Sequence, residues 1–197
     1  MRQNNRGRGS GPSSGIQGSH AADRSVKHSG QVFTPGFLVR NMLDYAGYVC
    51  GNILEKHIID NSCGAGAFLC EAVARYCSEY VANHDDNVGL KADLERFVHG
   101  IELDPVVCAD CRSNLDGIAK DFGVENVGWD LLNTNALSVT RYDGQMDFVV
   151  GNPPYVRVHN LEEDYDEVKS FRFAEGGMTD LYLAFYELGL RLSLIHI

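Results

Sequence analysis

Residues 60–69 read Asp60-Asn61-Ser62-Cys63-Gly64-Ala65-Gly66-Ala67-Phe68-Leu69 and join two segments of different apolar spacing. The segment that ends at Asp60 begins at His57 and is a short apolar run, which predicts a buried strand. After the glycines, apolar residues recur every three or four positions as far as Tyr80, which predicts a helix. Glycine lets the backbone turn tightly between the two elements. This order of strand, glycine loop and helix indicates an α/β fold.

The same alternation continues along the chain. Further helices are predicted around residues 37–49, over 105–122 with a proline in the first turn, and from residue 180 onward. Between them, Phe97–Leu103, Val127–Leu132 and Met146–Val150 read as strands, and Asp85–Glu95 reads as an inserted polar stretch. The pattern predicts a mostly parallel sheet with helices on both faces and a ligand at the carboxyl ends of the strands.

Composition places the chain among globular proteins. Its 197 residues are 44% hydrophobic and 22% charged, which suits one domain by the usual size of about 100–200 residues. The first 27 residues are rich in Gly, Ser, Asn and Arg, so we expect a disordered leader followed by a domain over residues 28–197. The net charge is −10, although the leader is basic. Any binding of nucleic acid must therefore use a local basic patch or something outside this chain.

The six cysteines are scattered, and no apolar run suits a signal peptide or a membrane span. We therefore expect free thiols in a cytoplasmic protein. Cys108 and Cys111 form one Cys-x-x-Cys pair, but no second pair or histidine stands at ligand spacing. No metal site is predicted.

The glycine loop and the end of the next strand suggest a site for a nucleotide-like ligand. Gly64 and Gly66 allow the backbone to approach a ligand, and the helix that follows presents free amides. The loop lacks the third glycine of dinucleotide-binding folds and the lysine of phosphate-binding loops. Glu102 ends the next strand, where a carboxylate can accept ribose hydroxyls. A structural turn and a solvated strand end remain the alternatives for these two features.

The strand Met146–Val150 leads into Gly151-Asn152-Pro153-Pro154-Tyr155. The two prolines stiffen this turn, so the Asn152 side chain and the Pro153 carbonyl are held as acceptors beside an aromatic ring. Such a pocket suits a planar amine, as on a base flipped from its duplex. An incidental proline-rich turn is the alternative.

These three motifs resemble those of S-adenosylmethionine-dependent amino-methyltransferases. Gly30-Gln31-Val32-Phe33-Thr34-Pro35 also resembles the cofactor-closing motif of adenine-specific DNA methyltransferases of restriction-modification systems. The order of the motifs is that of the gamma type, and the resemblance covers about residues 27–192. It implies a Rossmann-like class I methyltransferase fold, incomplete at the C-terminus.

The resemblance also implies roles for individual residues. Those expected to act on the reacting amine are Asn152, Pro153 and Tyr155. Those expected to contact the target base are Asn152, Pro154, Tyr155, Asp180 and Phe185. Those expected to hold S-adenosylmethionine are Phe33, Thr34, Pro35, Asp60, Cys63, Gly64, Gly66, Phe68, Glu102, Leu103, Asn135, Ala136 and Asn152. Asn135 stands where the family commonly has Asp, which leaves that contact with the cofactor adenine open.

The implied reaction is methyl transfer to the exocyclic amine of adenine in double-stranded DNA, with the adenine flipped out. Sequence recognition would then need a separate or missing target-recognition domain or a specificity subunit. Methylation of a protein glutamine or an RNA base is an alternative, and so is a cofactor-binding fragment without catalysis. Because the last predicted helix has no cap and no strand after it, we expect a C-terminally truncated chain.

Overall fold

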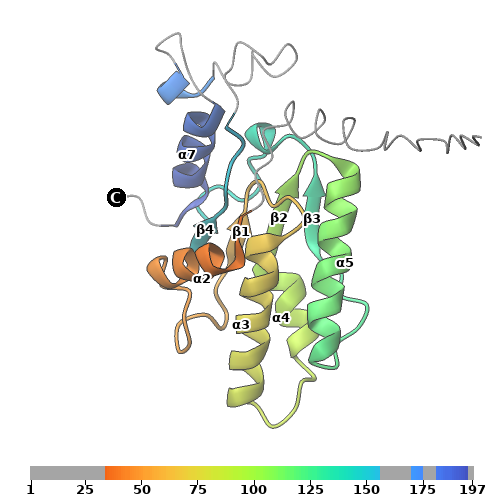
Figure 1. Cartoon of the computed structure of the whole chain (residues 1–197). Coiled ribbons are helices and arrows are strands. Elements are labelled where there is room, and N and C mark those ends of the chain that lie inside the picture. Colours follow the sequence, from red (N-terminus) through yellow and green to blue (C-terminus); the bar gives the residue numbers. More distant parts are fainter. Residues whose placement is uncertain (1–33, 156–169, 175–180, 195–197) are drawn as a thin grey trace, which may run out of the picture.

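The structure is a computed structural model that describes residues 34–155, 170–174 and 181–194 (Figure 1). The expected leader 1–27, Phe33 and Asp180 lie outside the described residues. The described part contains a parallel sheet with helices packed on it.

Four parallel strands form the sheet in the order β3-β2-β1-β4. They are β1 (Ile58–Asp60), β2 (Val98–Glu102), β3 (Asp130–Asn133) and β4 (Phe148–Val150). In the register, Asp60 lies opposite Gly100 of β2 and Val150 of β4. Because the strands are parallel, their carboxyl ends meet at one edge, which brings the loops that follow β1, β2 and β4 together.

Successive strand residues point to opposite faces, and each face has its own core. Ile58 belongs to the first core and Ile59 to the second, and Leu131 and Leu132 divide in the same way. The first core is covered by α2 (Gly36–Tyr45), α3 (Ala67–Asn83), α4 (Leu90–Phe97) and α5 (Pro105–Asp121). The second is covered by α7 (Leu181–Leu192) and the short helix η1 (Ala136–Ser138).

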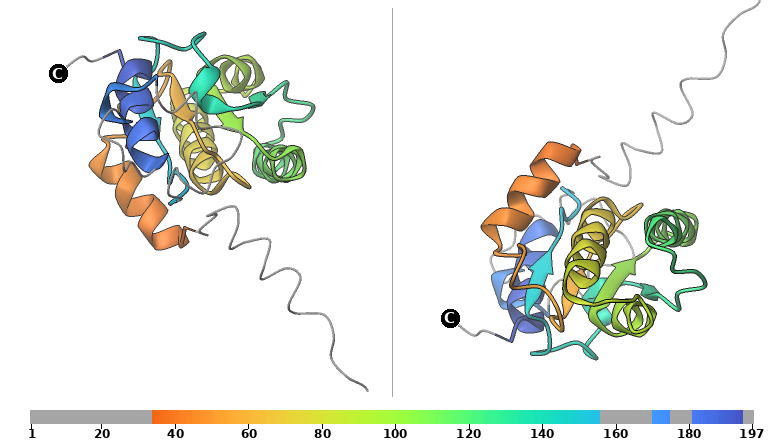
Figure 2. Two further views of the ribbon diagram at one scale, coloured as in Figure 1. Left: turned by 90° about the horizontal axis from the view of Figure 1, so that it is seen from above. Right: turned by 90° about the horizontal axis from the view of Figure 1, so that it is seen from below.

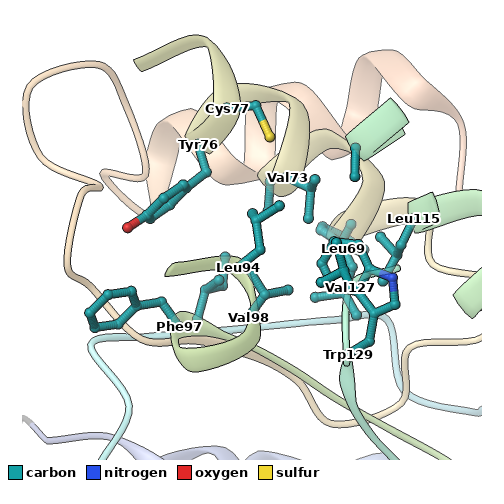
Figure 3. Close-up of a cluster of buried hydrophobic side chains, with 14 of the residues drawn as sticks. Leu69, Val73, Tyr76, Cys77, Leu94, Phe97, Val98, Leu115, Val127 and Trp129 are labelled. Atoms are coloured by element: carbon teal, nitrogen blue, oxygen red, sulfur yellow. The ribbon is translucent and has the colours of Figure 1, made fainter. Parts of the chain in front are cut away.

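The two further views show α3 and α7 on opposite sides of the sheet (Figure 2). Within the first core, Leu69 and Val73 of α3 pack with Leu94, Leu115 and other apolar side chains (Figure 3). The fold is therefore the predicted three-layer arrangement, with helices on both faces of a parallel sheet.

Helix α5 begins as the sequence predicts. Pro105 stands in its first turn, and the Asp104 carboxylate caps the helix by accepting from the amides of Val106 at 2.8 Å and Val107 at 3.2 Å. The cap fixes where β2 ends and where the helix starts. The connection between Glu102, the last residue of β2, and the helix is consequently short.

The polar insertion predicted over Asp85–Glu95 is wrong for its second half. Residues Leu90–Phe97 form α4, because Leu90, Leu94 and Phe97 lie on one face and are buried in the first core. The strand predicted from Phe97 therefore begins at Val98. The strand predicted over Val127–Leu132 is Asp130–Asn133 in the structure.

Helix α2 exists where the apolar spacing predicts it, but it buries a different face. Phe37, Leu38, Met42 and Tyr45 are exposed, whereas Val39 and Leu43 are buried against the first core. Arg75 of α3 fastens this helix by donating to the Asp44 carboxylate at 2.6 Å. Packing of α2 against the first core decides which of its apolar faces is buried.

Candidate functional site

The glycine loop after β1 has the tight geometry that its glycines predict. Gly64 and Gly66 take positive φ values of 53° and 89°, a region that side chains disfavour. The loop is fixed from two sides, since the Cys63 amide donates to the Ile101 carbonyl at 2.9 Å and the Asn114 side chain donates to the Ala65 carbonyl at 2.9 Å. Strand β2 and helix α5 therefore shape the loop together.

Behind the loop the packing is close. A Cβ on Gly66 would lie 2.8 Å from the Cys111 sulfur, so only glycine fits there without a shift. Cys63 and Phe68, two of the residues predicted to hold the cofactor, have buried side chains in the first core. Gly64 differs from Gly66, because a Cβ at Gly64 would meet no atom within 4 Å.

Glu102 ends β2 at the same edge and is buried. Its carboxylate accepts from the Gly64 amide at 2.9 Å and from the Asp104 amide at 2.9 Å. It thereby connects the glycine loop to the start of α5. Each carboxylate oxygen can accept a second hydrogen bond, which a ligand hydroxyl can supply. Leu103, the next residue, is exposed beside it.

Asp60 lies at the centre of the edge and is almost fully buried. Burial raises the pKa of its carboxyl to about 7, and the nearby Glu102 carboxylate adds to the increase, while the Ser62 amide opposes it by donating at 3.0 Å. A Cβ on Gly151 would lie 2.7 Å from Oδ1 of Asp60. The loop after β4 therefore approaches Asp60 closely because residue 151 is glycine.

Ser62 is a candidate that sequence reasoning missed. Its hydroxyl oxygen is buried and has no hydrogen-bond partner among the described residues. A buried polar atom without a partner costs free energy, so this hydroxyl is suited to meet a ligand. The signal available in the sequence was its place between Asp60 and the loop glycines, where a polar side chain faces the same edge.

The motif after β4 meets the segment before α2. The Asn152 amide donates through Nδ2 to the Thr34 hydroxyl at 3.2 Å, across 118 residues of sequence. Thr34 is buried, and the following Pro35 accepts from the amides of Leu38 and Val39 in the first turn of α2. Because Asn152 donates to Thr34, its carbonyl oxygen Oδ1 remains available as an acceptor.

The other predicted residues lie around this junction or along the same edge. Pro153 and Pro154 are half-buried, and Tyr155 is 64% exposed. Phe185 of α7 packs against the second core. After β3, Asn135 caps η1 by accepting from the Leu137 amide at 3.1 Å, and Ala136 is buried. The Asn135 carbonyl oxygen thus already has a backbone partner.

Two further properties concern only the residues that the structure describes. No group of three or more His, Cys, Asp or Glu side chains in these ranges is arranged to hold a metal ion. None of the helices there is long and apolar enough to cross a membrane.

The sequence matches one family along most of its length. The family profile described as N-6 DNA Methylase matches residues 19–185. This chain belongs to the N-6 DNA methylase family. The match begins inside the segment expected to be a leader and includes the glycine loop, the end of β2 and the Asn152 motif.

Individual members of the family are similar but longer. The type II methyltransferase M.PaeR7I of Pseudomonas aeruginosa is 30% identical over 143 residues, which are 70% of this chain and 25% of that protein. The type II methyltransferase M.BstVI of Geobacillus stearothermophilus is 29% identical over 182 residues, which are 85% of this chain and 32% of that protein. This chain thus spans between a quarter and a third of the length of these curated relatives.

A solved structure shows the same fold. A Listeria monocytogenes protein assigned to the class I S-adenosylmethionine-dependent methyltransferases superposes with a TM-score of 0.54 at 21% identity. The superposition covers 86% of this chain and 46% of that one. The predicted class I methyltransferase fold is therefore confirmed for the N-6 DNA methylase chain.

Proposed function

We propose that this chain carries the cofactor site and target-amine site of an S-adenosylmethionine-dependent enzyme that methylates the exocyclic amine of adenine in DNA, within a restriction-modification system. The hydrogen bond between Asn152 and Thr34 carries this proposal. It joins the turn that suits a planar amine to the segment expected to close over the cofactor. Membership of the N-6 DNA methylase family supports the same substrate.

The residues at the sheet edge fit the cofactor chemically. Asp60 and Glu102 present two buried carboxyl groups, and Ser62 presents a buried hydroxyl that has no hydrogen-bond partner in residues 34–155, 170–174 and 181–194. A cationic ligand would stabilise the ionised form of Asp60, whose pKa burial raises to about 7. S-adenosylmethionine carries such a positive charge. It also carries ribose hydroxyls, which can donate hydrogen bonds to the Glu102 carboxylate. When bound, this cofactor supplies a methyl group already activated by its sulfonium charge.

The chain's own groups would orient the amine. Oδ1 of Asn152 and the carbonyl oxygen of Pro153 would each accept a hydrogen bond from the amine, which would orient the nitrogen lone pair for the transfer. Because Nδ2 of Asn152 donates to the Thr34 hydroxyl, the oxygen of this amide would be left to accept from the amine. Tyr155 and Pro154 would contact the ring of a flipped adenine, with Asp180 and Phe185 nearby in the expected site.

DNA binding needs more than these residues. The net charge of −10 repels a phosphate backbone, and the basic residues of the expected leader 1–27 supply one local exception. We infer that a separate target-recognition domain or a specificity subunit reads the base sequence. All six cysteines are free thiols, which agrees with a proposed place in the reducing cytoplasm.

The test is transfer of labelled methyl from S-adenosylmethionine to unmethylated DNA by the purified chain, followed by digestion and separation of the nucleosides. We expect label in methylated adenine. RNA and a glutamine-containing peptide are supplied in parallel reactions, so label there would instead support the corresponding alternative. Equilibrium binding of S-adenosylmethionine is measured on the same sample. Cofactor binding with no label in any substrate would leave only the cofactor half of the proposal standing.

A further inference from the structure

Tyr182 lies beside Tyr155 although 27 residues separate them in sequence. Their ring centroids are 6.3 Å apart and their planes are tilted by 39°. Tyr182 is the second residue of α7, whose neighbours Leu181 and Ala184 are buried in the second core. The chain that leaves β4 runs beside this end of α7 (Figure 1). A well-anchored helix therefore presents one aromatic ring to another on a less regular segment.

The two rings are not part of a core. Tyr155 is 64% exposed and Tyr182 is 39% exposed, so burial alone does not explain their contact. Among the described residues, Tyr182 is the only one whose ring contacts that of Tyr155. An aromatic pair in this distance range contributes about 0.5–1.5 kcal/mol beyond area burial, which is enough to favour one side-chain rotamer over others.

We propose that Tyr182 is a positioning residue, which holds the ring of Tyr155 in the orientation needed to stack on the target base. This inference rests on the proposed function, because it assigns a task to the base-contacting Tyr155. Without Tyr182, the exposed Tyr155 ring samples other rotamers and meets the base in the right orientation less often. The cofactor edge at Asp60 and Glu102 is formed by other elements and is unaffected.

Helix α7 offers a matched control one turn further along. Tyr186 is also a tyrosine on the exposed side of α7, and it is 64% exposed. Its ring pairs with that of Phe173 at 6.3 Å and 33°, not with Tyr155. Tyr186→Ala therefore removes an equal side chain from the same helix without touching the Tyr155 pair.

The experiment compares Tyr182→Ala, Tyr182→Phe and Tyr186→Ala with the wild-type chain, each carrying fluorotyrosine at position 155. Fluorine NMR reports the orientation of the Tyr155 ring without any substrate. Methyl transfer to DNA is measured in parallel as kcat and KM. For Tyr182→Ala we expect a shift of the Tyr155 resonance toward that of a free side chain and a loss in kcat/KM for DNA of about 2- to 12-fold. Tyr182→Phe and Tyr186→Ala should retain the wild-type values, and S-adenosylmethionine binding should stay the same in all variants.

Three outcomes would count against the inference. An unchanged Tyr155 resonance in Tyr182→Ala would show that the ring needs no support from α7. Equal losses of transfer in Tyr182→Ala and Tyr186→Ala would indicate a general weakening of the helix. A shifted resonance with unchanged transfer would remove the catalytic consequence. If the wild-type chain transfers no label to adenine, the proposed function fails, and the NMR comparison still decides whether Tyr182 positions Tyr155.

Discussion

At the scale of single residues, Asn152 unites two requirements of an amine pocket. Its Nδ2 is occupied by Thr34 at 3.2 Å, which leaves Oδ1 oriented as an acceptor. Asp60 and Ser62 lie along the same sheet edge, where the Ser62 amide donates to the Asp60 carboxylate at 3.0 Å. In the proposed site, Asp60 and Glu102 would contribute mainly to cofactor binding and Asn152 mainly to orienting the amine, so substitution should separate the two effects.

Asn152→Ala should lower the rate of methyl transfer by at least about 100-fold, the effect of removing one preorganised polar group at a reacting centre. Binding of S-adenosylmethionine should change little, because the carboxylates of Asp60 and Glu102 remain. Single-turnover transfer and equilibrium cofactor binding are the two measurements. Thr34→Val serves as the partial variant, since it leaves Oδ1 in place but frees its orientation, and should give a smaller loss. Equal losses of cofactor binding and transfer in Asn152→Ala would contradict this separation.

Asp60→Asn should make the ligand-free chain more stable at alkaline pH. In the folded chain the carboxyl has a pKa of about 7, against an ordinary value of 3.8. Its contribution to the free energy of unfolding is therefore fully present below pH 3.8 and is lost as the pH rises through 7. At about pH 8.5 the variant avoids a buried carboxylate, and we expect a gain of about 1–3 kcal/mol after the cost of a new buried amide. Urea unfolding at that pH and near pH 4 gives the comparison. A difference between variant and wild type that does not depend on pH would argue against a raised pKa.

At the scale of elements, the glycine loop is held by β2 and α5 as much as by its own sequence. Cys63 donates to Ile101 of β2, and Asn114 of α5 donates to Ala65. Gly66 lies against Cys111 of α5 at a distance that leaves no room for a methyl group. The loop conformation is thus a property of three elements packed together.

Gly64→Ala and Gly66→Ala should differ in their effect on stability. At Gly64 the new methyl meets no atom within 4 Å, so only the positive φ opposes it, at a cost of about 1 kcal/mol. At Gly66 the methyl also meets the Cys111 sulfur at 2.8 Å, and we expect a cost of about 2–4 kcal/mol. Urea unfolding measures both. The double variant Gly66→Ala/Cys111→Ala should recover part of the loss, and strictly additive effects would show that the contact is not the cause.

Near the amino ends of β1, β2 and β3, at the edge opposite the candidate site, side chains form a chain of hydrogen bonds. Nδ1 of His57 lies 2.8 Å from Nε2 of His99, and Nδ1 of His99 lies 2.7 Å from Oδ2 of Asp130. Only one proton can lie between the two imidazoles, so this contact needs one of the two facing ring nitrogens to be without a proton. Burial lowers the pKa of His57, and the neighbouring His99 lowers it further.

The free energy of unfolding should therefore fall as the pH drops below the ordinary histidine value of 6.5, because the unfolded chain takes up the proton more readily than the folded one. His57→Asn keeps a side-chain amide that can donate to His99 but cannot gain a charge. We expect a smaller decline for this variant than for the wild type between about pH 7.5 and about pH 5. Urea midpoints at both pH values test it, and parallel declines would show that His57 does not contribute.

At the scale of the whole molecule, the sheet separates two cores, and the candidate site lies at the carboxyl edge of the sheet. The first core lies under α2, α3, α4 and α5, and the second lies under α7 and η1. The carboxyl edge that carries Asp60, Glu102 and Asn152 receives loops from both sides. Since Asp60, Glu102 and Asn152 all come from the chain itself, we expect cofactor binding not to need DNA.

S-adenosylhomocysteine, the product form of the proposed cofactor, should stabilise the chain in the absence of DNA. At about 100 times its Kd, a ligand that binds only the folded state adds about 2.7 kcal/mol to the free energy of unfolding. Thermal unfolding with and without this ligand measures the effect, and adenosine monophosphate serves as a control ligand. Glu102→Gln should reduce the increase, because it removes the carboxylate charge proposed to accept hydrogen bonds from the ribose hydroxyls. No stabilisation of the wild-type chain would count against the cofactor assignment.

The sequence alone determined the local features of this protein. Periodicity predicted the strands, most of the helices and their α/β order, and the glycines and prolines marked the two turns that carry the site, because these backbone conformations depend on neighbouring residues. Asp85–Glu95 shows where that reasoning fell short, since α4 is recognised by the core that its apolar residues fill. The tertiary structure alone decided which face of α2 is buried and that Thr34 meets Asn152. It also decided that the Ser62 hydroxyl has no hydrogen-bond partner in the part of the chain that the structure describes, and that burial raises the pKa of Asp60. These properties depend on tertiary packing, because the strand order β3-β2-β1-β4 brings segments that are distant in sequence to one sheet edge.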